Sequence, residues 1–201
     1  MNRNIAKAGA LIVAVSVFLF AVFMLIPFDF GSYFVCMLLA IGYVMMAAGF
    51  SSESDAAHRV AAKAGMAFAI IYVTLVLLVY FAQTTTVRLE SMTDQAVRLL
   101  DYSRGGLMFS YDLLGYGMMA LSTFFLGLTI PGHDPVDQWL KRLMIIHGIF
   151  FFGCFILPMT GIFRPMADGE ASMGGVIALE CWCVYFLPIG ILSFFHFRSG
   201  R

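Results

Sequence analysis

Six apolar runs divide the sequence and constrain its fold more than any other feature. They occupy about residues 8–26, 32–50, 65–82, 107–129, 143–163 and 175–195. Each run is close to the ~20 residues that a helix needs to cross the hydrocarbon core of a bilayer. A segment inside lipid must satisfy its backbone hydrogen bonds internally, which favours helices for runs of this length. The sequence therefore predicts an all-α polytopic membrane protein, with residues 1–201 forming a single bundle of six transmembrane helices.

The composition supports a membrane protein and argues against several other classes. The chain is 61% hydrophobic and 12% charged, whereas soluble domains are about 25% charged. Its net charge is zero, so it lacks the basic field that nucleic-acid binding requires. The cysteines and histidines lack the spacing of a metal or haem site, so neither a cofactor nor a metal is predicted.

Lys and Arg residues predict the orientation of the bundle in the cell membrane. If both termini lie inside, eight of these residues fall on the inner side and four on the outer side, and the bias favours this N-inside, C-inside arrangement. The inner set is Arg3, Lys7, Arg59, Lys63, Lys141, Arg142, Arg198 and Arg201, and the outer set is Arg88, Arg98, Arg104 and Arg164. The first run ends without a small-x-small cleavage pattern, so we expect a retained span rather than a signal peptide.

Two connecting segments carry recognisable helix signals. Residues 86–104 place apolar side chains on one helical face and charged ones elsewhere, and Gly105 and Gly106 follow. This pattern predicts a short amphipathic helix that lies flat on the outer surface or covers a cavity mouth. Asp134-Pro135-Val136-Asp137 resembles an N-cap, a proline at the first helical position and an acid at the third, and it predicts the start of the fifth helix.

The sequence also contains a weak internal repeat. Gly-Tyr-Val-Met-Met-Ala at 42–47 nearly matches Gly-Tyr-Gly-Met-Met-Ala at 115–120, and both copies lie on spans predicted to run from outside to inside. One interpretation is a duplicated helical hairpin, as in some transporters. The other is a pair of similar packing faces, since small residues let helices approach closely.

Two acidic residues lie inside predicted spans and define the candidate site. Asp112 is on the fourth span and Glu180 on the sixth, each about 7–9 Å below the outer edge at a rise of about 1.5 Å per residue. Charged residues at bilayer depth are costly and mark functional sites by default. Arg164 ends the fifth span at the same surface, and Tyr116 and Tyr111 lie near Asp112. We expect these five residues to line an outward-opening pocket on spans four to six.

Such a pocket suits the binding or transport of a small molecule, a cation or a proton. Two adjacent acids favour proton-coupled transport or cation capture, because like charges disfavour ionisation of both. A static pair of Arg164 with either acid, fixing helix register, is the structural alternative. The protein could also be an accessory subunit that packs on a membrane-protein partner or on a second copy. An intramembrane enzyme acting on lipid is the least supported class, because His147 is predicted near the opposite surface from the acids.

Overall fold

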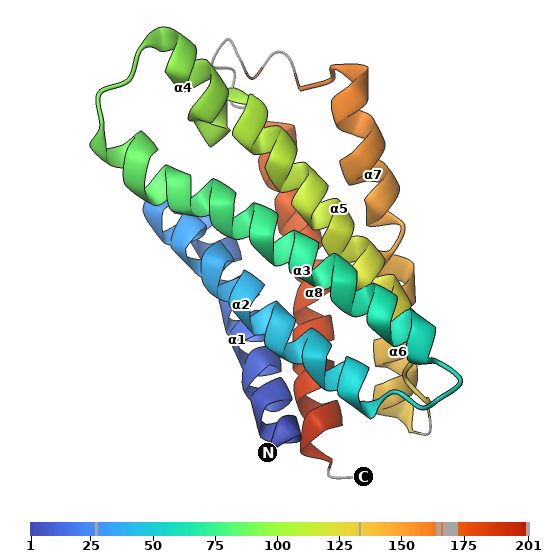
Figure 1. The fold of residues 1–201 in the computed structure, drawn as a ribbon. Helices are drawn as coiled ribbons and strands as arrows, with labels where there is room; N and C mark the ends of the chain where they lie inside the picture. Colours follow the sequence, from blue (N-terminus) through green and yellow to red (C-terminus); the bar gives the residue numbers. More distant parts are fainter. Residues whose placement is uncertain (27, 133, 164–165, 167–172, 200–201) are drawn as a thin grey trace.

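A computed structural model describes residues 1–26, 28–132, 134–163, 166 and 173–199, and these residues form helices joined by turns and loops, with no strand among them (Figure 1). The helices are α1 (Asn2–Leu25), α2 (Asp29–Glu53), α3 (Arg59–Ala82), α4 (Asp94–Leu100), α5 (Leu107–Gly127), α6 (Pro135–His147), α7 (Phe150–Ile156) and α8 (Met173–Arg198). A π-helix, η1 (Gln83–Val87), extends α3, and two 3₁₀ segments are η2 (Tyr102–Arg104) and η3 (Leu157–Thr160). The all-α prediction is confirmed.

Five helical segments among the described residues are long and apolar enough to cross a membrane, which is consistent with a helical membrane protein. They are Asn2–Leu25, Asp29–Glu53, Arg59–Val87, Pro135–Thr160 and Gly175–Arg198. Helix α5 corresponds to the fourth predicted span but is not one of these five, although it is 21 residues long. It contains the buried polar residues Asp112, Ser122 and Thr123. The crossing of all six helices and their orientation therefore stay predictions.

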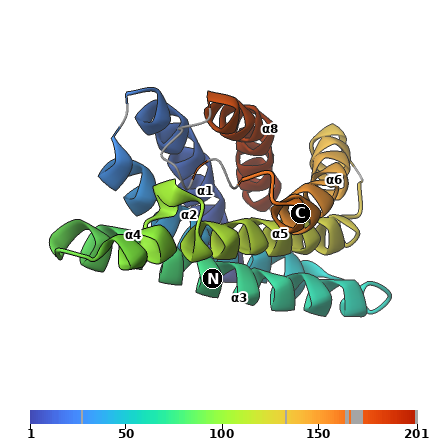
Figure 2. The same cartoon turned by 90° about the horizontal axis from the view of Figure 1, so that it is seen from above.

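Helix α5 is the central element at the candidate site. It packs against α3 along much of its length and also contacts α2, α4, α6 and α7, whereas α8 packs on α1 and α6. Figure 2 shows α3 and α5 side by side across one face of the bundle, with α1, α6 and α8 on the other side. The start of α1 and the end of α8 lie at one end, here called the terminal end, and α4 lies at the opposite end, here called the α4 end (Figure 1).

The fifth predicted span begins where its capping sequence indicated. The carboxylate of Asp134 accepts a hydrogen bond from the backbone N–H of Asp137 at 2.9 Å, and Pro135 occupies the first helical turn, as predicted. The helix is interrupted after His147, and α7 resumes at Phe150. Gly148 at the break lies so close to α5 that a Cβ there would be 2.9 Å from the Phe124 side chain.

The segment predicted as one amphipathic helix over 86–104 contains three shorter pieces. Helix α4 is capped by the Thr93 side chain, which accepts a hydrogen bond from the Ala96 N–H. It lies between the π-helix η1 and the 3₁₀ turn η2, and Gly105 ends the turn with a left-handed φ of 64°. The predicted helix is therefore present but shorter. Because α4 contacts η1, η2 and the start of α5, it covers the helix ends at this side.

Candidate functional site

Asp112 is a buried carboxyl group near the start of α5, with only one of its oxygens hydrogen-bonded. The residue is 2% exposed. The Tyr80 hydroxyl of α3 donates a hydrogen bond to Oδ2 at 3.1 Å. The second oxygen, Oδ1, is buried and has no hydrogen-bond partner among the described residues. Buried polar atoms in proteins nearly always have partners, so an orphaned oxygen requires an explanation.

Three tyrosine rings from different elements form a wall around this carboxyl group. Tyr33 of α2 stacks on Tyr80 of α3 with ring centroids 5.5 Å apart. Tyr102 of η2 completes the cluster, with its centroid 5.9 Å from each of the other two. These are ordinary distances for aromatic rings in contact. The three rings therefore leave no space between them for a bulky organic ligand.

Gln83 connects the end of α3 to the end of α4 and to the turn η2, the two elements that cover this tyrosine cluster. Its Nε2 donates to the Leu100 carbonyl at 2.8 Å, and its Oε1 accepts from the Tyr102 backbone N–H at 3.0 Å. Gln83 is 3% exposed and is the first residue of the π-helix η1. Single π turns inside helices occur often at functional sites, where they redirect a side chain. Here the two bonds join α3 to both sides of the α4–η2 connection.

Burial also affects the outer tyrosine of this cluster. Tyr102 belongs to the short turn η2, outside the five candidate spans. Its burial, followed by the nearby Asp112 carboxyl, raises the pKa of the Tyr102 hydroxyl well above its usual value. Tyr102 therefore stays a neutral phenol across the physiological range and can act as a hydrogen-bond donor.

The structure brings together only part of the predicted site. Asp112 lies beside α2 and α3, where Tyr80 donates a hydrogen bond to it and Tyr33 and Cys36 are close to it. Glu180 is half-buried on α8, and its Oε1 has no hydrogen-bond partner among the residues that the structure describes. No described hydrogen bond or ion pair joins the two acids.

The other three predicted site residues have different positions. Tyr116 is partly buried one turn along α5 from Asp112, where its hydroxyl lies 3.7 Å from the Cys36 sulfur and its ring contacts Trp182 of α8 at 5.2 Å. Tyr111 is 38% exposed, because consecutive helical residues point about 100° apart. Arg164 lies outside the described residues.

His147 forms a separate polar cluster deeper in the bundle. The residue is 1% exposed. The Trp182 indole N–H donates to Nε2 at 3.1 Å, and Nδ1 lies 2.7 Å from the Thr123 hydroxyl. Since Nε2 accepts from the indole, the ring proton belongs on Nδ1, and the ring is a neutral imidazole with both nitrogens satisfied. His147 is thus a packing residue held by Thr123 of α5 and Trp182 of α8.

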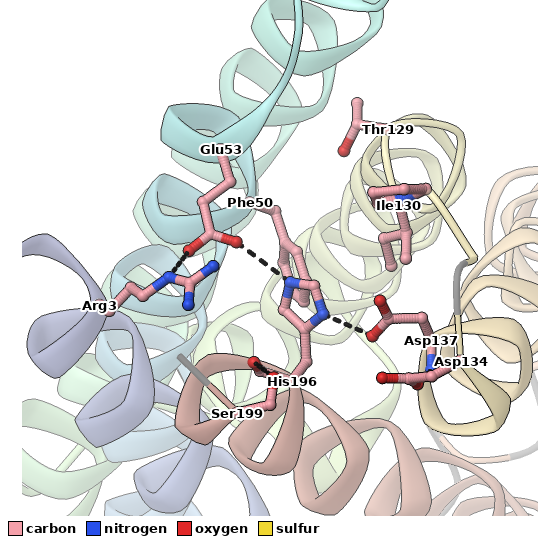
Figure 3. A pocket seen from close by; sticks show the side chains of 10 residues that line it. Arg3, Phe50, Glu53, Thr129, Ile130, Asp134, Asp137, His196 and Ser199 are labelled. Atoms are coloured by element: carbon pink, nitrogen blue, oxygen red, sulfur yellow. Dashed lines mark hydrogen bonds and ion pairs between the residues drawn. The ribbon is translucent and has the colours of Figure 1, made fainter. Parts of the chain in front are cut away.

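A second candidate site lies at the terminal end, around a cavity of about 230 Å³ (Figure 3). The His196 ring of α8 lies between two carboxylates, with Nδ1 2.6 Å from Asp137 and Nε2 3.2 Å from Glu53. The other oxygen of Glu53 accepts a hydrogen bond from Arg3 Nε at 2.7 Å. These side chains come from α1, α2, α6 and α8, so the cluster joins four helices.

Sequence reasoning missed both the tyrosine cluster and this charged cluster. Tyr80 and Gln83 are ordinary residues near the end of an apolar run, and their role depends on which face meets α5. Glu53, Asp137 and His196 lie near helix ends, where polar residues are expected at a membrane surface. A shared predicted depth was the available signal for grouping them. The described residues contain no group of three or more His, Cys, Asp or Glu side chains positioned to hold a metal ion.

The chain matches no family model, no curated protein and no solved structure. The functional argument therefore depends on the chemistry of the two polar clusters. Of these, the Asp112 cluster contains a buried carboxyl oxygen that has no hydrogen-bond partner among the described residues.

Proposed function

We propose that this membrane protein binds a proton at Asp112 and uses that group in proton-coupled binding or transport from the α4 end. The observation that carries the proposal is the buried carboxyl with one hydrogen bond from Tyr80 and one oxygen without a partner. An ionised carboxylate there would have only neutral phenols beside it, Tyr80 and the nearby Tyr102, and a buried charge without a counter-ion is very unfavourable. A protonated carboxyl avoids that penalty, and its O–H can be donated to an arriving group.

Two features favour a proton over a larger cation as the bound species. No ion pair in the described part of the chain includes Asp112. The rings of Tyr33, Tyr80 and Tyr102 also contact one another at 5.5–5.9 Å. An aromatic cage for an organic cation needs its rings spread around the ligand. The closed cluster suits a small species that the carboxyl group can hold by itself.

A carrier has to expose this carboxyl group to water at some stage. The contact that keeps it covered at the α4 end is the pair of hydrogen bonds from Gln83 to Leu100 and Tyr102. Breaking both bonds would free η2 and remove the Tyr102 ring from the cluster. Two neutral hydrogen bonds are worth about 1–3 kcal/mol together, which is small enough for thermal opening.

Infrared spectroscopy across a pH titration tests proton binding directly. A carboxyl group absorbs at a different frequency when it is protonated, and ¹³C-labelled aspartate identifies the band. We expect wild-type protein to show a protonated aspartate band at neutral pH that Asp112→Asn lacks. The matched control is Asp94→Asn, since Asp94 is exposed on α4 and should leave the band unchanged.

A flux measurement tests the transport part of the proposal. Purified protein is reconstituted into liposomes containing a pH-sensitive dye, and proton entry is followed after a potential is imposed. We expect flux above that of empty vesicles in wild type and in Asp94→Asn, and loss of that flux in Asp112→Asn. A band that persists in Asp112→Asn refutes proton binding, and wild-type flux equal to that of empty vesicles refutes transport.

A further inference from the structure

The cluster at the terminal end consists of one histidine held between two carboxylates. His196 has a side chain that is 10% exposed, whereas that of Asp137 is 13% exposed and that of Glu53 is 25% exposed. The ring nitrogens lie 2.6 Å from Asp137 and 3.2 Å from Glu53. Figure 3 shows the ring between the two acids, which come from α6 and α2 while His196 comes from α8.

The number of ring protons decides whether both contacts can exist at once. A neutral imidazole carries one N–H and one acceptor nitrogen, whereas an imidazolium carries two N–H donors. Ionised carboxylates only accept hydrogen bonds. The two contacts of His196 therefore require a doubly protonated ring. When the ring loses a proton, one nitrogen faces a carboxylate with lone pairs on both sides, and that contact becomes repulsive.

From this geometry we propose that Glu53, His196 and Asp137 form a proton-dependent bridge that holds the ends of α2, α6 and α8 together. Loss of the ring proton releases the longer contact, to Glu53, while the shorter one, to Asp137, stays. Helix α2 then separates from α6 and α8 at the terminal end. The bridge is distinct from the Asp112 site, and neither proposal depends on the other.

The surrounding charges are consistent with a ring that gains and loses a proton. Besides the two bridging acids, Asp134 of α6 and Arg3 of α1 line the same cavity. A protonated ring has both bridging acids as hydrogen-bond acceptors and lies among charged groups of both signs. Other charged groups at this end include Arg198 on α8 and Lys141 on α6, and Lys141 donates to the Ile130 carbonyl.

The cavity beside the bridge offers a path for the proton. Its volume of about 230 Å³ is bordered by both the charged residues and the apolar Phe50, Ile130 and Pro131. A water molecule occupies about 30 Å³ in the liquid, so several can enter a polar cavity of this size. A proton can therefore reach or leave the ring through water in this cavity.

The sharpest test replaces Glu53 with its neutral amide. In Glu53→Gln, the side-chain N–H can donate to the unprotonated Nε2 of His196, while the side-chain oxygen still accepts from Arg3. The bridge then persists with a neutral ring, so its pH dependence should disappear while its structure stays. In Asp137→Asn, the side-chain N–H can likewise donate to the unprotonated Nδ1 of His196, and this variant is used if the first fails to fold. His58→Gln is the matched control, because it removes an exposed His58–Asp55 pair within one loop at the same end.

Distances between spin labels measure the response. With the native cysteines replaced, labels at Ser52→Cys on α2 and Gln138→Cys on α6 report the separation of these helices by pulsed electron resonance. Between about pH 5 and about pH 8, we expect the distance to lengthen and broaden in the otherwise wild-type protein and in His58→Gln. It should stay constant in Glu53→Gln. The proposal would be overturned if the distance did not change in wild type. It would also be overturned if Glu53→Gln and Asp137→Asn showed the same change in distance as wild type, or if His58→Gln showed no change.

Discussion

The glycines of the internal repeat are predicted to respond differently to the same substitution. At Gly42 on α2, an added Cβ would lie 2.8 Å from Ile12 Cβ and 3.0 Å from the Gly9 carbonyl oxygen of α1. Ordinary contact begins at 3.4 Å, so the first contact is too short by 3.4 − 2.8 = 0.6 Å. Both atoms are fixed to the backbone of α1, so the two helices must move apart. At Gly115 on α5, the nearest atom would be Val76 Cγ2 at 3.3 Å, only 0.1 Å inside ordinary contact.

These distances give different stability changes. Overpacking a well-packed contact costs about 1–3 kcal/mol, whereas replacing a helical glycine by alanine restores about 0.5–1 kcal/mol. Gly42→Ala should therefore lower the free energy of unfolding by a net ~1–2 kcal/mol. Gly115→Ala should change it by less than about 0.5 kcal/mol, because its small overlap and its helix gain nearly cancel. Gly153→Ala is the control with no atom within 4 Å, and it should be neutral or stabilising.

Reversible unfolding of the three variants in mixed micelles of dodecyl sulfate, followed by circular dichroism, measures these changes. The reasoning would be refuted if Gly42→Ala and Gly115→Ala lowered the free energy of unfolding equally. It would also be refuted if the Gly42→Ala protein were as stable as Gly153→Ala. The expected difference would also bear on the repeat, because equivalent positions of a duplicated hairpin in one packing environment should respond alike.

Three further predictions concern hydrogen bonds at single sites. Thr123→Val leaves the Nδ1–H of the buried His147 without an acceptor and should lower the free energy of unfolding by about 1–3 kcal/mol; unchanged stability would show that the ring has another partner. Asp134→Ala removes the cap of α6 and should cost about 0.5–2 kcal/mol, seen as faster amide exchange confined to the first turn of that helix. Gln83→Leu removes the acceptor of the Tyr102 amide, so exchange at that amide should quicken on the order of tenfold, and an unchanged rate would mean that Gln83 does not hold the cover.

Much of the fold could be predicted from the sequence, because the thickness of the bilayer sets the length of a membrane-spanning helix. Apolar runs of about 20 residues predict helices without any knowledge of their neighbours. Signals that act within a few residues also served well, as the Asp134 cap and the left-handed Gly105 show. The sequence predicted helix boundaries less well where contacts between helices determine them. The break after His147 depends on the close approach of Gly148 to Phe124 of α5, which the sequence of α6 does not reveal.

The site was harder to predict, because helical depth is readable from the sequence but rotation is not. Asp112 and Glu180 were grouped by their matching depth, yet the face of α5 that carries Asp112 packs toward Tyr80. A helix can turn about its axis without any change in hydropathy pattern when apolar residues surround it on all sides. The neighbours of Asp112 are therefore set by the packing of α5 on α3, including the close contact of Gly115 with Val76.

The two ionisable residues buried on neighbouring helices show why position alone does not identify a functional group. His147 and Asp112 are both at most 2% exposed, and the rule for charged residues in membranes marks both as functional candidates. Both ring nitrogens of His147 have hydrogen-bond partners, so the hydrogen bonds to Thr123 and Trp182 account for the burial of this residue. Asp112 retains an oxygen that no described residue satisfies. An oxygen without a partner does not stabilise the fold, since asparagine or leucine at this position would avoid burying an acid. The stability lost by burying the Asp112 carboxyl group is accounted for if that group takes up and releases a proton.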